Sequence, residues 1–376
     1  MRSRASEMFG IEFPLFAFSH CRDVVAEVSR AGGFGVLGAV AHSPDQLDID
    51  LRWIEEQVGD RPYGVDLLLP KKFAGSDEGG LDPAQLAEVI PAENREFVDE
   101  LLIRYDVPPL ADEADGRRGI GGMNVSPKGY EPLLDVAFAH RSSLIASALG
   151  APPPQLIERA HAADVAVAAL AGTRAHAERH AVAGVDLIVA QGTEAGGHTG
   201  EIATMVLVPE VVDAVAPLPV LAAGGIARGR QMAAALALGA EGVWTGSVWL
   251  TTEESETTPV VRKKYVAASS SDTVRSRSIT GKPARMLRSA WTDEWEAEGA
   301  PEPLPMPLQP MLVGEALARI NHAAHHAGSG AEQLTNYFVG QVVGSLNQVR
   351  PARAVVLEMI EEFIAAVDDL AGRLDD

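Results

Sequence analysis

The stretch "PVLAAGGIARGRQMAAALALGAEGVWTGSVWL", residues 219–250, contains a complete strand–helix–strand pattern. An apolar run at 219–225 is followed by an Ala-rich segment with helical spacing at 228–240, and a second apolar run covers 242–250. Buried parallel strands read as short apolar runs, and a helix normally connects each strand to the next. The stretch therefore predicts a β–α–β unit at the end of a parallel sheet.

The same alternation runs through the preceding two thirds of the chain. It predicts eight strands in all, at residues 12–18, 34–40, 63–69, 143–149, 165–172, 185–192, 219–225 and 242–250. Eight strand–helix pairs close a (β/α)₈ TIM barrel, with an open doubly wound sheet as the alternative. The rhythm is interrupted at about 71–127 by a polar segment rich in Gly and Pro, which predicts an insertion after the third strand.

After residue 250 the strand pattern stops. A helix–loop–helix segment, a Pro-rich linker at 299–310 and two amphipathic helices near 311–326 and 350–374 are expected there. We expect residues 1–250 to form the barrel, including the insertion, and residues 251–376 to form a mainly helical cap over one barrel mouth. The amphipathic tail is compatible with a homodimer.

Composition excludes several classes of partner. The formal net charge of −21 repels nucleic acid and anionic lipid, so neither is expected as a partner. The most apolar stretch, 205–227, carries Glu210, Asp213 and three prolines, which disfavours a membrane helix. One cysteine, Cys21, permits no internal disulfide, and the first residues lack the apolar core of a signal peptide. These features predict a cytoplasmic protein.

Glycine-rich turns follow the last three predicted strands. Active sites of TIM barrels lie at the carboxyl ends of the strands, and a phosphate often sits after strands seven and eight. Gly224 and Gly225, with Gly246 and the hydroxyl of Ser247, are therefore candidates for a phosphate site. The alternative is that these glycines only form tight turns.

One histidine, His198, stands at such a strand end. It follows Gly196 and Gly197, whose bare backbone would let a planar ring approach, and an imidazole can exchange a proton there. The alternative is a histidine that only holds the loop by hydrogen bonds. No H-E-x-x-H or paired-cysteine motif occurs, so no metal is expected.

Several stretches resemble the nitronate monooxygenase family, formerly called 2-nitropropane dioxygenases. They are "VAQGTEAGGHTG" (189–200), "TGKPARMLR" (280–288), the 219–250 stretch, and the opening "FPLFAF…VSRAGGFGVLGA" with "YGVDLLL". The resemblance implies an FMN-containing TIM barrel with a smaller helical domain beside the flavin. It implies that His198 acts as a base or substrate-binding group. The flavin contacts it implies are Asp66 (at an asparagine of the family), Gln191, Gly196, Gly225, Trp244, Thr245, Gly246 and Ser247.

Two departures from the family pattern concern the pocket. The family's Pro-Met after the first strand is replaced by "FSH", which makes Ser19 and His20 candidate pocket residues. Asp66 adds a carboxylate, which would oppose an anionic flavin or nitronate unless it is protonated or paired.

The resemblance implies FMN-dependent oxidation of alkyl nitronates with O₂ to a carbonyl compound and nitrite. In that reaction His198 would be a base for a neutral substrate or a cationic anchor for an anionic one. A first alternative is an NAD(P)H-dependent reductase of enoyl thioesters or quinones on the same barrel. The others are a flavin-free phosphosugar isomerase or nucleotide dehydrogenase, and a non-catalytic flavin-binding or assembly protein.

Overall fold

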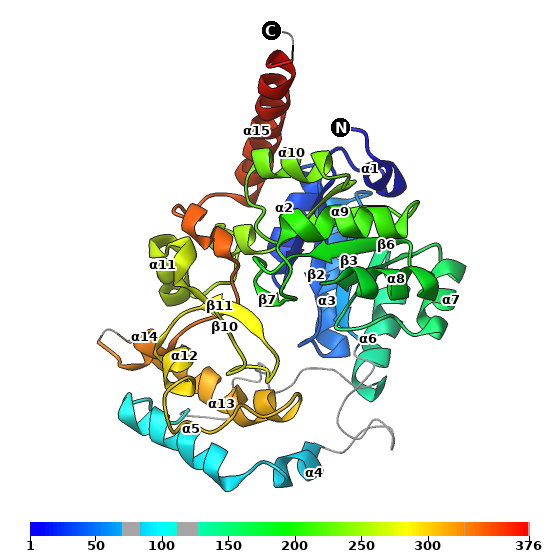
Figure 1. Cartoon of the computed structure of the whole chain (residues 1–376). Helices are drawn as coiled ribbons and strands as arrows, with labels where there is room; N and C mark the ends of the chain where they lie inside the picture. Colours follow the sequence, from blue (N-terminus) through cyan, green and yellow to red (C-terminus); the bar gives the residue numbers. More distant parts are fainter. Residues whose placement is uncertain (70–82, 111–126, 327, 375–376) are drawn as a thin grey trace.

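The computed structural model describes residues 1–69, 83–110, 127–326 and 328–374. Eight parallel strands close into a barrel, in which β9 pairs back onto β1 through Leu15 and Val243. This closed arrangement confirms the predicted TIM barrel, and Figure 1 shows the helices that surround its strands. The strands are β1 (Leu15–Ser19), β2 (Phe34–Gly38), β3 (Tyr63–Leu68), β4 (Leu144–Ala148), β5 (Ala166–Ala171), β6 (Leu187–Gln191), β8 (Val220–Ala223) and β9 (Gly242–Thr245).

Two apolar layers hold the barrel together. Alternate strand residues point inward, where Phe16, Phe34 and Leu187 fill the interior, or outward, where Val65 and Ile188 meet the helices. The covering helices are α2 (Arg22–Arg30), α3 (Pro44–Val58), α6 (Pro127–Ala139), α7 (Pro154–Ala162), α8 (Arg174–Ala183), α9 (Thr204–Val215) and α10 (Gly229–Ala237).

A short N-terminal helix, α1 (Arg4–Phe9), closes one mouth of the barrel. Its Phe9 ring packs 5.5 Å from the ring of Phe16 and 4.7 Å from that of Phe34, measured between centroids. The amino ends of the strands are therefore plugged, which leaves the carboxyl ends for ligands.

A second hydrophobic core joins the insertion to the tail. From the insertion come α4 (Pro83–Glu88) and α5 (Ala92–Arg104), and Leu101 of α5 packs with Trp291 and Ile320 of the tail. The tail helices are α11 (Pro259–Ala267), α12 (Ala290–Trp295), α13 (Leu308–Ala323), α14 (Ala331–Leu334) and α15 (Ala352–Gly372). This second core lies beside the open mouth, whereas α15 packs against α10 and α2 on the outer wall and projects beyond them (Figure 1).

Two predictions about this part of the chain were wrong. The eighth strand ends at Thr245, because Gly246 leaves the extended conformation (φ −130°, ψ −63°), and Ser247–Thr251 form a 3₁₀ helix, η3. The tail also contains two antiparallel strands, β10 (Thr273–Ser276) and β11 (Ala284–Leu287), where only helices and loops were expected. Four-residue strands containing Arg and Ser are too short to show a two-residue apolar period.

The small sheet formed by these strands reaches into the barrel mouth. β11 pairs with β7 (Gly197–His198), a two-residue strand in the loop after β6. The tail therefore holds the backbone of the candidate histidine directly. Among the helices of the described ranges, none is long and apolar enough to span a bilayer.

Candidate active site

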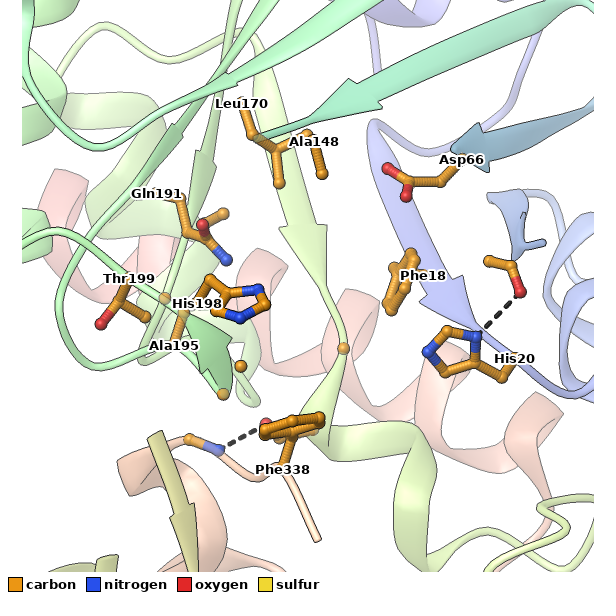
Figure 2. Close-up of a pocket in the computed structure, with 18 of the residues that line it drawn as sticks. Phe18, His20, Asp66, Ala148, Leu170, Gln191, Ala195, His198, Thr199 and Phe338 are labelled. Carbon is orange, nitrogen blue, oxygen red and sulfur yellow. Dashed lines mark hydrogen bonds between the residues drawn. The ribbon is translucent and has the colours of Figure 1, made fainter. Parts of the chain in front are cut away.

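A cavity of about 990 Å³ lies between the carboxyl ends of the barrel strands and the tail. Its size is at the upper end of the range for small-molecule sites. Figure 2 shows Gln191 and His198 on one side, and Phe18, His20 and Asp66 on the other. All the residues predicted from the sequence line it: Ser19, His20, Asp66, Gln191, Gly196, Gly197, His198, Gly224, Gly225, Trp244, Thr245, Gly246 and Ser247.

Bare backbone gathers at one end of the cavity. Gly224 and Gly225 adopt positive φ of 98° and 72°, which favours glycine and turns the chain sharply after β8. In the described part of the chain, the amides of Gly225, Ile226 and Gly246 have no acceptor. The Ser247 hydroxyl accepts from Gly340 N at 2.8 Å, so its own proton remains available. This group of donors is suited to an anion.

The first turn of α10 offers few free donors to that anion site. Gln231 Oε1 accepts from the amides of Ala227 and Arg228, and Glu362 of α15 accepts from the amide of Gly229. The guanidinium of Arg228 is paired with Glu362 as well, at 2.9 Å. The helix amides are therefore satisfied within the protein, and the loop amides remain for a ligand.

The two glycines before His198 have different roles. A Cβ on Gly196 would lie 2.8 Å from Gly340 N, so this glycine allows close contact between the histidine loop and the tail. A Cβ on Gly197 would meet nothing within 4 Å, but its φ of 77° favours glycine. Both glycines line the cavity, and their contact with a planar ring stays a prediction.

His198 is neutral in this setting. Burial, reinforced by the nearby charge of Lys282, lowers the pKa of its imidazole to about 4. The ring lies beside Phe338, with 6.3 Å between centroids. A neutral imidazole can accept a proton but carries no charge, which argues against His198 as the cationic anchor.

Thr280 fixes the orientation of that imidazole. Its hydroxyl donates to the carbonyl oxygen of Lys282 at 3.2 Å, so at the 2.8 Å contact with His198 it accepts the hydrogen of Nε2. Nδ1 is then the unprotonated nitrogen.

Lys282 was missed by sequence reasoning. It lines the cavity beside His198, and in the described residues no carboxylate or carbonyl accepts from its ammonium. Partial burial lowers the pKa of this lysine. Nothing in the spacing of "TGKPARMLR" indicates that β11 brings Lys282 to the histidine.

The histidine loop is held by two arginines of the small sheet. Arg285 Nε donates to Thr193 O at 2.8 Å, and Arg275 Nη2 donates to Thr199 O at 3.1 Å. Because these bonds join carbonyls on either side of His198, the tail fixes the loop at both ends.

Asp66 and His20 form the opposite wall. The Asp66 side chain is 6% exposed, and burial raises the pKa of its carboxyl well above the usual value. His20 Nδ1 donates to Gly38 O at 2.8 Å, and the remainder of its ring is exposed to the cavity. Desolvation by the surrounding protein lowers the pKa of His20, and because Nδ1 carries the hydrogen donated to Gly38 O, Nε2 is the unprotonated nitrogen.

Cys21 and Ser19 are engaged in local contacts. The Cys21 thiol donates to Glu254 O at 3.0 Å, and burial raises the pKa of this thiol. Ser19 Oγ accepts from the Cys21 amide at 3.1 Å. A Cys21–His20 nucleophile is thus not assembled. No cluster of three potential metal ligands occurs in the described ranges.

The cavity suits a flat heteroaromatic ring with an anionic tail. Its walls include Phe18, Leu170 and Trp244, and Figure 2 shows the carboxyl group of Asp66 directed into the cavity from the opposite side to His198. Hydrogen-bond donors suited to an anion, the loop amides after β8 and β9 and the Ser247 hydroxyl, lie at one end of the cavity. A flavin nucleotide has this combination of a flat ring, polar ring edge and phosphate.

Residues 2–362 match the model of the nitronate monooxygenase family. The chain belongs to that family. It is 68% identical, over 99% of both chains, to a putative monooxygenase of Mycobacterium tuberculosis. FabK of Thermotoga maritima is a structural neighbour, with a TM-score of 0.72, 27% identity and 99% of each chain covered.

A third similar protein is a nitroalkane oxidase of Streptomyces ansochromogenes. Its TM-score is 0.78 with 24% identity, covering 97% of this chain and 99% of that one, which shows a common fold. Membership of the nitronate monooxygenase family makes this chain a flavin oxidoreductase acting on a small molecule with O₂. The expected family and enzyme class are confirmed.

Proposed function

We propose that this chain binds FMN and oxidises alkyl nitronates with O₂ to a carbonyl compound and nitrite. The observation that carries the proposal is Lys282, a cation without a carboxylate partner in the described residues, beside a neutral His198. An apolar cavity with an unpaired cation beside its histidine favours a small organic anion.

FMN is proposed because its single phosphate matches the donors after β8 and β9. The amides of Gly225, Ile226 and Gly246 and the hydroxyl of Ser247 would hold it. The flavin ring would lie over the carboxyl ends of the barrel strands, against Trp244. When bound, the flavin supplies electron transfer from the substrate and the reaction with O₂.

The neutral state of His198 favours nitronate over the parent nitroalkane. A base whose conjugate acid has a pKa of about 4 is weak against a C–H proton. A nitronate has already lost that proton, so it needs charge compensation instead, which Lys282 provides. The unprotonated Nδ1 of His198 then serves to position the substrate or accept a proton later in turnover.

The test is an anaerobic titration of the FMN-loaded protein, followed by its visible spectrum. We expect propyl nitronate to bleach the flavin rapidly and nitropropane to do so much more slowly. Bleaching by NADH or NADPH but not by nitronate would instead support an NAD(P)H-dependent reductase. A protein that takes up no FMN would contradict the proposal altogether.

The His198→Ala variant separates catalysis from simple flavin binding. Turnover lost with flavin retained supports a catalytic site and argues against a flavin-binding assembly protein. His176→Ala is the control, because His176 lines the same cavity from α8 without contacting Thr280. Equal loss in both variants would contradict the role given to His198.

A further inference from the structure

Asp66 occupies an unusual place in the barrel. It lies on the inward face at the carboxyl end of β3, above the apolar interior. Its neighbours across the sheet are Gly38 on β2 and Ala146 on β4. Figure 2 shows its carboxyl group directed into the cavity. Neither neighbour carries a polar side chain that could bond to the carboxyl group, which faces the cavity.

No donor in the described residues reaches the Asp66 side chain. The titratable groups that face it are His20, at the end of β1, and His42, after β2, whose Nε2 is bonded to Asp50 at 3.0 Å. Ala146 and Ala148 of β4 contribute none. An ionised carboxylate buried without a partner is strongly unfavourable, so Asp66 keeps its proton.

A protonated carboxyl group has one O–H to donate, and it requires an acceptor when the cavity is filled. His20, which is bonded to the carbonyl of Gly38 in the strand next to Asp66, presents the opposite function, an unprotonated Nε2. The wall therefore offers a donor and an acceptor on the two sides of Gly38. An imide, –C(=O)–NH–, is the complementary ligand edge.

We propose that Asp66 acts as a neutral carboxylic acid that donates its proton in a hydrogen bond to a carbonyl oxygen of the bound flavin ring, while His20 Nε2 accepts the adjacent imide N–H. The inference rests on the proposed binding of FMN. It assigns to this wall the recognition of the pyrimidine edge of the ring. It also makes flavin affinity depend on the protonation of one aspartate.

The state of Asp66 is tested first without any ligand. Infrared spectra of the apoprotein should contain a carboxylic-acid C=O band near neutral pH that disappears in Asp66→Asn. Asp45→Asn, an exposed aspartate on α3 outside the cavity, should leave the band in place. An ionised Asp66 in the apoprotein would overturn the proposal.

The second test measures FMN affinity by quenching of flavin fluorescence at rising pH, up to the pH at which the carboxylic-acid band of Asp66 disappears from the infrared spectrum of the apoprotein. Deprotonation of Asp66 should weaken FMN binding by at least about tenfold relative to Asp66→Asn, whose amide remains a donor at all these pH values. Parallel pH profiles for the wild type and Asp66→Asn would overturn the proposal. Asp66→Ala should bind FMN more weakly than Asp66→Asn throughout.

The third test concerns His20. A 3-methyl-FMN probe, which lacks the imide N–H, should bind at least about tenfold more weakly than FMN to the wild type but nearly equally to His20→Ala. Equal discrimination by both proteins would overturn the role given to His20. Absence of FMN binding by the wild type at every pH would instead refute the proposed cofactor.

Discussion

Replacing Lys282 with methionine tests the electrostatic basis of substrate choice. Methionine keeps much of the length of the chain but removes the charge beside His198. Two unit charges about 4 Å apart attract by about 4 kcal/mol at an effective dielectric constant near 20. Because Lys282 is only half-buried, solvent reduces this to about 1–2 kcal/mol, or roughly fivefold to thirtyfold in binding.

The assay is kcat/KM from oxygen consumption, with propyl nitronate and nitropropane at the same pH and at two salt concentrations. We expect Lys282→Met to lower kcat/KM for the nitronate by roughly fivefold to thirtyfold, with a smaller effect on the nitroalkane. Added salt should weaken the wild-type preference more than that of the variant. Lys263→Met, an exposed lysine on α11, is the control.

An equal loss for both substrates would refute the reasoning, since a neutral substrate gains nothing from a cation. Unchanged nitronate kinetics would refute it as well. The same variant should raise the pKa of His198, because the charge of Lys282 is one of the two causes that lower it. The pH titration of the His198 ring signals by NMR measures that shift.

Three further predictions concern other contacts. Thr280→Val should lower kcat by about tenfold or more, and ¹⁵N NMR spectra should then show both tautomers of His198. Thr280→Ser, which keeps the hydroxyl, should show one tautomer. A single tautomer in Thr280→Val would contradict the assignment. Gly225→Ala, at φ 72°, should cost about 1–2 kcal/mol of stability in urea and weaken FMN binding; unchanged FMN affinity would exclude this turn from the phosphate site. Glu362→Gln should cost about 1–2 kcal/mol at neutral pH. The Glu362 side chain is nearly buried, and its hydrogen bonds to Arg228 and Arg230 hold its pKa below the usual value. Its contribution to stability is therefore fully present above the unfolded pKa of about 4.3 and is lost as the pH falls through the lower folded pKa. If the free energy of unfolding falls with acid as steeply in Glu362→Gln as in the wild type, this assignment is refuted.

The barrel could be predicted because its signals are local. Each strand is a short apolar run, each helix has its own spacing, and caps such as Ser43 or stops such as Gly184 mark the ends. Glycine-rich turns also mark the carboxyl ends of strands by composition alone. Since parallel β–α units place those ends together, the sequence determined that Gly225, Gly246 and His198 share one mouth.

The chemical state of the site was decided by tertiary contacts. The short strand β11 brings Thr280 and Lys282 to His198 across some eighty residues of chain, and no periodic pattern signals such a pairing. Burial and neighbouring charge then keep His198 neutral and Asp66 protonated. Residue types and spacing predict which groups meet at a barrel mouth. Protonation, however, depends on desolvation and on partners distant in sequence, which exist only in the folded chain.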